Sequence, residues 1–277
     1  MRRLAVLMTM MVVAQGAQAA DLPDFLGAPL RGGFQDGPAP HADWRGFYVG
    51  GQAGAGFSNM NFTGAADSLI SQLLANTTIQ NEFQVSQWPL MGKVSASGQG
   101  YGGFFGYNAQ WDEAVLSLEA SYLHGEFGGS TSGSMSRLFT TSDGYSNSVT
   151  SSATAKVDVH DMMTFRARGG YAWGNLLPYM FAGVSLGFAD VVRSATVTAS
   201  GTYIGTNVPP PPNYGPVTLN AVDQKNNQFI YGYSAGFGAD YMLFSNLFLR
   251  GEYEYLRFTA STDVSINTIR GGIGLKF

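Results

Sequence analysis

The sequence predicts an all-β fold: an eight-stranded antiparallel transmembrane β-barrel with short periplasmic turns and long extracellular loops. Three observations predict it, namely few charges, a period-two pattern of apolar residues, and connections that alternate between short and long. Charged residues make up 12% of the 277 residues, whereas a typical soluble domain has about 25%. A barrel in lipid explains the deficit, because the lipid-facing half of each strand tolerates almost no charge.

The composition excludes several other classes. With 19 Phe, 14 Tyr and 4 Trp, the chain has enough apolar material to rule out a disordered protein. Outside the N-terminal 15 residues, no apolar run approaches the roughly 20 residues that a membrane helix needs. A net charge of −4 with only 15 Lys and Arg argues against nucleic acid as a partner.

Residues 1–19 are typical of a signal peptide. Two arginines precede an apolar stretch at 4–14, and small residues follow it. Cleavage is predicted between Ala19 and Ala20, so the protein is expected to be exported. The chain contains no cysteine, and a chain of this length does not need disulfides for stability.

A Pro- and Gly-rich periplasmic lead segment is predicted at 20–43, followed by the barrel domain at 44–277. In that domain, apolar or small residues alternate with polar or charged ones, which gives a strand two different faces. With the glycine-rich segment 98–111 the count is eight strands. The other seven alternating segments are 47–52, 116–122, 164–173, 179–188, 231–241, 249–255 and 268–277.

The connections between these strands alternate in length, as periplasmic turns and surface loops do in membrane barrels. Within the long connections, 68–79 is expected to pack as a plain loop, with a short surface helix as the alternative. Segment 128–155 is interpreted as a mobile loop or as strands that extend past the membrane. Short links are predicted at 112–113, 174–175 and 244–246, long ones at 60–97, 128–155 and 193–227, and a brief one at 259–263.

Two rim features support this topology. Trp44, Trp111 and Trp173 lie at strand ends assigned to the periplasm, so we expect a periplasmic aromatic girdle. The last strand ends at Phe277, preceded by Gly274 and Leu275. A terminal Phe on an alternating strand predicts a signal for the barrel assembly machinery.

Several motifs resemble the alphaproteobacterial small outer-membrane immunogenic protein family. They read WRGFYVGG at 44–51, TFRARGGY at 164–171 followed by LPY at 177–179, GEYEY at 251–255 and TIRGG at 268–272. The resemblance covers almost all of the barrel and implies a barrel of the OmpA membrane-domain type. The long loops depart from the family, so no ligand or host contact is carried over.

Most charges in the strands fall at inward positions, four acids against five bases. Because an eight-stranded barrel is about wide enough for its own side chains and buried charges must pair, we expect a self-paired network that fills the lumen. A charged, selective pore is the alternative. The predicted lumenal charge network comprises Glu119, Arg166, Arg168, Asp240, Arg250, Glu252, Glu254, Arg270 and Lys276.

Signals for catalysis are weak. The glycines of 98–103 are interpreted as strand glycines, because no strand–helix unit follows them. The alternation places His124 outward and His160 inward, so they are not expected to converge. Neither has a His-x-Ser neighbour. We therefore expect a non-enzymatic protein with no catalytic residue, no metal and no cofactor.

The sequence as a whole predicts an integral protein of the cell outer membrane with a structural and surface role in the Gram-negative envelope. Its expected partners are outer-membrane lipid or lipopolysaccharide and the barrel assembly machinery. Two alternatives stay open. One is a narrow, low-conductance porin, and the other is binding of a ligand such as haem, or of a host surface, through the loops.

Overall fold

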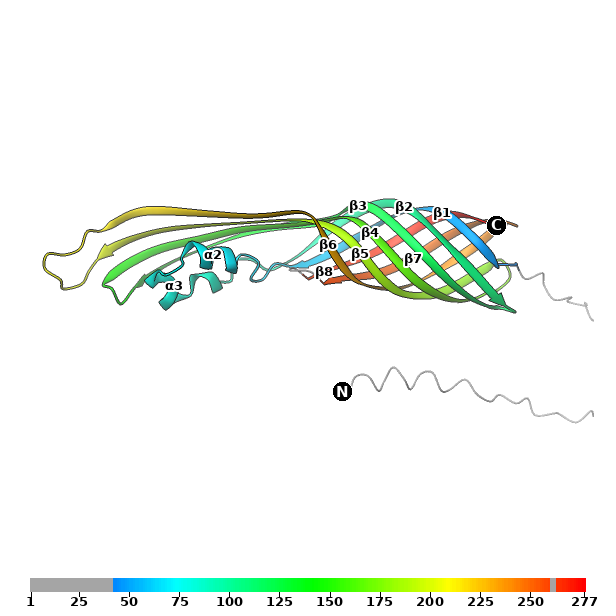
Figure 1. Cartoon of the computed structure of the whole chain (residues 1–277), viewed down its shortest axis with the longest axis horizontal. Coiled ribbons are helices and arrows are strands. Elements are labelled where there is room, and N and C mark those ends of the chain that lie inside the picture. The colour runs from blue at the N-terminus through cyan, green and yellow to red at the C-terminus, as the bar shows by residue number, and fades with distance from the viewer. Residues whose placement is uncertain (1–41, 260–262) are drawn as a thin grey trace, which may run out of the picture. The chain divides into compact units, whose positions relative to one another are not determined.

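The computed structural model describes residues 42–259 and 263–277, so the signal peptide and nearly all of the lead segment lie outside the described residues. Eight antiparallel strands form one closed ring in which each strand pairs with the next and β8 pairs with β1 (Figure 1). The strands are β1 (Gly46–Asn61), β2 (Lys93–Trp111), β3 (Ala114–Thr140), β4 (Tyr145–Tyr171), β5 (Leu176–Tyr203), β6 (Tyr214–Phe244), β7 (Leu247–Thr259) and β8 (Val264–Lys276). The predicted fold class and strand count are confirmed.

Burial alternates along each strand of the ring, as the sequence pattern predicts. On the outer face, apolar side chains stay exposed, for example Phe105 at 63%, Leu118 at 71% and Ile269 at 71%. Their neighbours point inward: those of Leu118 and Ile269 are polar or charged, and those of Phe105 are Phe104 and Gly106. In lipid, this outer face is the apolar band that a membrane barrel requires.

The strands differ greatly in length. β1, β7 and β8 have 16, 13 and 13 residues, a few more than the roughly 9–11 that a tilted strand needs to cross a bilayer. β3, β4, β5 and β6 have 27, 27, 28 and 31 residues. These four strands continue past the ring as a sheet, which we call the extension (Figure 1).

The extension corrects part of the loop prediction. Segments 128–155 and 193–227 are strand for most of their length, and only the connections 141–144 and 204–213 are not. The reason is a period-two pattern in which Val and Ala are buried between Ser and Thr, for instance at Val149, Ala153 and Ala155. The alternative that 128–155 consists of strands extending past the membrane is confirmed.

The β1–β2 connection is also more ordered than expected. It contains α2 (Asp67–Leu73), α3 (Thr78–Phe83) and a short 3-10 turn, so the plain loop expected at 68–79 is wrong. Leu69, Ile70 and Leu74 of this segment are buried in one apolar cluster with the Val and Ala face of the extension. That face supplies the apolar surface which a helix of this length needs in order to form.

No helix among the described residues is long and apolar enough to cross a membrane.

Bulges cross the extension where it leaves the ring. The pairing register shifts between His124 and Phe127 on β3, around His160 on β4, and around Asp190 on β5 opposite β6. Asn227 on β6 has a positive φ of 52°, and its N–H donates to Asp190 Oδ1 at 2.8 Å. A row of bulges at one height bends and twists all four strands together.

Tyrosines hold the far end of the extension. The rings of Tyr145 and Tyr203 lie 5.3 Å apart, and those of Tyr145 and Tyr214 lie 5.6 Å apart. In the nearby β3–β4 turn, the Thr141 hydroxyl donates to Asp143 and lowers the pKa of that carboxyl below its usual value. The tip is therefore built from side-chain contacts as well as backbone pairing.

Candidate functional site

The middle of the ring is filled by a layer of charge. Eight of the nine charged residues predicted to face the lumen are buried, each with 5% or less of its surface exposed. Four are acids and four are arginines, so their formal charges cancel. The members of this layer are Glu119 on β3, Arg166 and Arg168 on β4, Asp240 on β6, Arg250, Glu252 and Glu254 on β7, and Arg270 on β8.

Glu119 is the centre of the charge layer. Its Oε1 accepts from Arg166 Nε at 2.8 Å, and its Oε2 accepts from Arg168 Nη1 at 2.6 Å and Arg250 Nη1 at 2.8 Å. The Tyr48 hydroxyl donates to the same Oε2 at 2.7 Å. One carboxylate therefore neutralises parts of three guanidinium groups from two strands.

The other acids complete the pairing. Asp240 accepts from Arg168 Nη2 at 2.7 Å and from Arg250 Nε at 2.8 Å. Glu252 accepts from Arg166 Nη2 at 2.8 Å. Charge-assisted pairs of this kind are the form in which buried charges are tolerated.

Further along β7 the layer continues with Glu254. It forms an ion pair with Arg270 and lies 3.9 Å from Arg166 Nη1. The interior thus joins β3, β4, β6, β7 and β8 through side chains. Because these contacts exist at only one alignment of the strands, the layer also fixes their register.

Lys276 departs from the predicted network. It occupies an inward position of the alternating pattern, but it lies at the periplasmic end of β8, where it is partly exposed. Its Nζ donates to the Arg45 carbonyl at 3.2 Å. The prediction is wrong for this residue because the alternation tells which face of the strand a side chain is on. It does not tell how far along the barrel axis the side chain lies.

An aromatic layer closes the periplasmic side of the charge layer. Arginine groups lie over its rings: Arg250 is 3.9 Å from the Phe104 ring centre, and Arg168 is 3.7 Å from that of Tyr179. Such cation–π contacts partly replace the lost hydration of the guanidinium groups. The layer consists of Trp44, Tyr48, Phe104, Val115, Leu177, Tyr179, Phe181, Met242 and Phe248, with Ala172.

The aromatic layer corrects the assignment of Trp44. Only 1% of its surface is exposed, and its ring packs at 6.1 Å from the Phe248 ring inside the barrel. It precedes β1, so strand parity could not assign its direction. Trp111 and Trp173 are 62% and 74% exposed.

A second apolar layer closes the other side of the charges. Its large side chains are almost fully buried and join the apolar cluster beneath α2. Many of the inward glycines lie against the rings of these layers. A side-chain carbon at Gly50 would come 2.3 Å from the Phe104 ring, for example. The second layer consists of Leu123, Phe127, Met162, Ile230, Leu256, Phe258 and Ile266.

The histidines lie differently from the prediction. His124 Nδ1 is 2.8 Å from Asp161 Oδ1, and His160 Nε2 is 3.5 Å from Asp161 Oδ2. Both therefore converge on one carboxylate, because His160 is the extra residue of the β4 bulge and the alternation shifts there. In the part of the chain that the structure describes, no group of three His, Cys, Asp or Glu could hold a metal ion.

Two members of the site escaped the sequence analysis. Tyr48 and Tyr179 donate from their hydroxyls to Glu119 and Glu252, the latter at 2.9 Å. The sequence pattern could have identified them, since both occupy inward positions of alternating strands. A tyrosine facing a lumen of arginines and acids can be expected to join their hydrogen bonds.

Comparison with known proteins agrees with this architecture. A family model described as an outer membrane protein beta-barrel domain matches residues 5–277. No curated protein matches the chain.

Among solved structures, similarity is found to Ail, the attachment invasion locus protein of Yersinia pestis. The identity is 11% and the TM-score 0.35, over 84% of this chain and 99% of that one. Neisserial surface protein A is 15% identical with a TM-score of 0.34, over 83% and 97%. The N-terminal barrel of Pseudomonas aeruginosa OprF is 12% identical with a TM-score of 0.28, over 82% and 99%. At these identities and TM-scores, no ligand or partner of those proteins is assigned to this chain.

Proposed function

The chain belongs to the outer membrane protein beta-barrel domain family, and from this premise we propose that it is a non-enzymatic barrel with a closed interior. As a member of that family it is an integral protein of the outer membrane. Its role is to reinforce the envelope and to present the extension outside the cell.

The closed interior is the observation that carries this proposal. Eight paired charges lie between an aromatic layer on one side and an apolar layer on the other. An ion would have to displace both layers and break the buried pairs. This arrangement supports a structural role over the alternative of a narrow, low-conductance pore.

Planar bilayer recording tests the closed interior. We expect purified refolded protein to show no sustained current, because no layer of the interior is open to water. A general porin inserted into the same bilayers serves as the positive control. Reproducible steps of uniform size from the wild-type barrel would establish the pore instead.

Finer assignments extend this proposal. Segments 44–51 and 164–171 support placing the chain in the alphaproteobacterial small outer-membrane immunogenic family. Export through a signal peptide cleaved between Ala19 and Ala20 fits the same origin. We also assign Trp111 and Trp173 to the periplasmic aromatic girdle, since both rings are exposed at the periplasmic end.

The end of β8 supports an assembly signal made of Gly274, Leu275 and Phe277. Phe277 is 76% exposed, so its ring is free for recognition. Its N–H donates to the Phe47 carbonyl at 2.8 Å, beside the seam where β8 meets β1.

Replacing Phe277 by Ala is expected to lower the amount of protein in the outer membrane severalfold. The ring makes little contact with the folded barrel, so the loss should arise during assembly. Quantitative blotting of outer-membrane fractions measures it, with Phe47→Ala, also outward and 66% exposed, as the matched control. Equal levels of both variants would contradict the assembly signal.

A further inference from the structure

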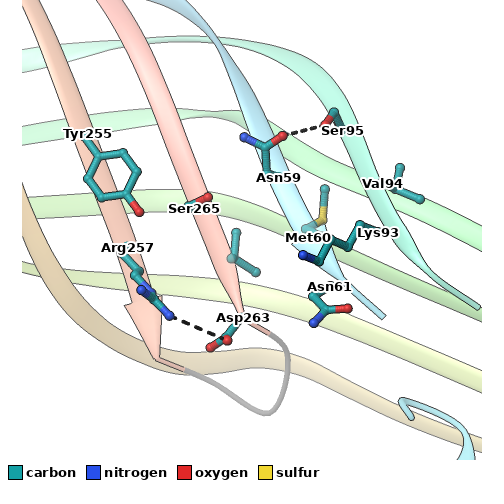
Figure 2. A pocket seen from close by; sticks show the side chains of 11 residues that line it. Asn59, Met60, Asn61, Lys93, Val94, Ser95, Tyr255, Arg257, Asp263 and Ser265 are labelled. Atoms are coloured by element: carbon teal, nitrogen blue, oxygen red, sulfur yellow. Dashed lines mark hydrogen bonds and ion pairs between the residues drawn. The ribbon is translucent and has the colours of Figure 1, made fainter. Parts of the chain in front are cut away.

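A cleft of about 430 Å³, lined by both polar and apolar residues, lies on the outer face of the barrel, at the extracellular ends of the short strands (Figure 2). Here β1, β2, β7 and β8 stop, while β3 to β6 continue into the extension. The described residues that carry its chemistry are Asn59, Lys93, Ser95, Tyr255, Arg257 and Ser265.

The height of the cleft follows from strand pairing. Phe57 is 64% exposed on the outer face of β1 and pairs with Asn267 of β8. The next outward pair is Asn59 with Ser265, which belongs to the cleft. Two residues along a strand correspond to roughly 7 Å. The cleft therefore begins one step above the apolar band, at the level of the outer-leaflet headgroups.

Two cations stand at the sides of the cleft. Lys93 lies on β2 and Arg257 on β7, with strands β8 and β1 between them. Lys93 forms no ion pair with any described residue. Arg257 has one carboxylate near it, Asp263 at 3.7 Å, and both side chains are about half exposed or more, at 49% and 62% (Figure 2).

Neutral hydrogen-bonding groups lie between the cations. Asn59 on β1 pairs with Ser95 on β2 and with Ser265 on β8, and Ser265 pairs with Arg257. The Ser95 hydroxyl donates to Asn59 Oδ1 at 2.5 Å, which leaves the Asn59 amide N–H groups for a ligand. Guanidinium, ammonium, amide and hydroxyl donors together are the set that recognises phosphate.

The rest of the rim carries more acids, and Lys156 lies 3.7 Å from one of them, Asp158. Where β3, β4 and β5 leave the barrel, the charged groups include Glu126, Asp158, Asp161 and Asp190. This side offers an anionic headgroup several acids as well as cations. On the side of the short strands, Lys93 and Arg257 therefore lie at the height of the lipid headgroups.

We propose that this cleft binds a phosphate group of lipopolysaccharide in the outer leaflet. The inference rests on the outer-membrane placement of the barrel, because only there does the cleft face that lipid. Lys93 and Arg257 contact the phosphate oxygens, and Asn59 donates to the phosphate or to the adjoining sugar.

Binding of bisphosphorylated lipid A to the mature barrel, refolded in detergent micelles, tests the site by native mass spectrometry. The variant Lys93→Gln/Arg257→Gln is expected to bind about tenfold more weakly, since the two charge contacts that are lost are solvent-exposed and each is weak. Its matched control, Lys156→Gln/Lys225→Gln, removes two cations from the extension and should bind like wild type. Dephosphorylated lipid A should bind wild type as weakly as bisphosphorylated lipid A binds the double variant.

Three results would overturn the site. They are equal affinity of the two double variants for lipid A, equal binding of dephosphorylated lipid A to the wild type, or displacement of lipid A by millimolar inorganic phosphate. If the double variant does not refold, the single variant Lys93→Glu, which reverses one charge at an exposed position, is used instead and should also bind lipid A more weakly than wild type. Heat-modifiable migration on detergent gels reports barrel folding separately. If the wild-type protein did not migrate in this way, the proposed outer-membrane barrel would be contradicted, whereas the proposal for the cleft would not be the cause.

Discussion

Replacing Glu119 by Gln is expected to lower the free energy of unfolding by about 3–5 kcal/mol, the range for removing one partner of a buried ion pair. The carboxylate contacts Arg166, Arg168 and Arg250. Gln keeps the shape but leaves the layer with one uncompensated positive charge. Urea unfolding of the refolded barrel in phospholipid vesicles measures the loss.

A control and a second variant make this prediction specific. Glu126→Gln removes an exposed acid from the same strand and should change stability by about 0.5 kcal/mol or less. Adding Arg250→Gln to Glu119→Gln restores neutrality, so the double variant should lose less than the sum of the singles. If Glu119→Gln and Glu126→Gln unfold alike, the charge layer contributes no stability.

Replacing Phe127 by Ala is expected to cost about 3–5 kcal/mol, the range for emptying a buried Phe site. Its side chain is fully buried and fills the space over three glycines. Side-chain carbons at Gly98, Gly100 and Gly125 would come 2.7, 3.0 and 2.9 Å from its ring. Since glycines have no side chain to move into the void, the site cannot collapse.

The same unfolding assay in vesicles measures this loss. Phe83→Ala provides the control, because Phe83 lies in α3, outside the ring, and is 36% exposed. It should cost about 1 kcal/mol, the typical value for a point substitution. A loss no larger at Phe127 than at Phe83 would show that the second apolar layer does not close the barrel tightly.

The closed barrel and much of its charge layer could be predicted from the sequence. The reason is that period-two alternation assigns a face to each residue of a regular strand. Arg166, Glu252 and Arg270 all followed from parity alone, and the balance of acids and bases indicated pairing. The particular partners could not be predicted, because they depend on the stagger between strands that are distant in sequence.

Three of the wrong predictions share a physical cause. Trp44 precedes β1, Lys276 ends β8, and His160 is a bulge residue. At each of these places the regular alternation has ended or shifted, so a rule based on it does not apply. In the extension, strands at 128–155 were predicted only as the alternative to a mobile loop, because this Ser- and Thr-rich segment has the composition of a loop.

The row of bulges has a mechanical consequence. It interrupts the ladder hydrogen bonds of four strands at one height, between the barrel and the extension. Bending stiffness is lowest along such a line. A sideways pull at the tip should therefore turn the extension about this crease, with the long strands acting as a lever arm. The load would spare the paired charges below, and the barrel could stay sealed while its outer part yields.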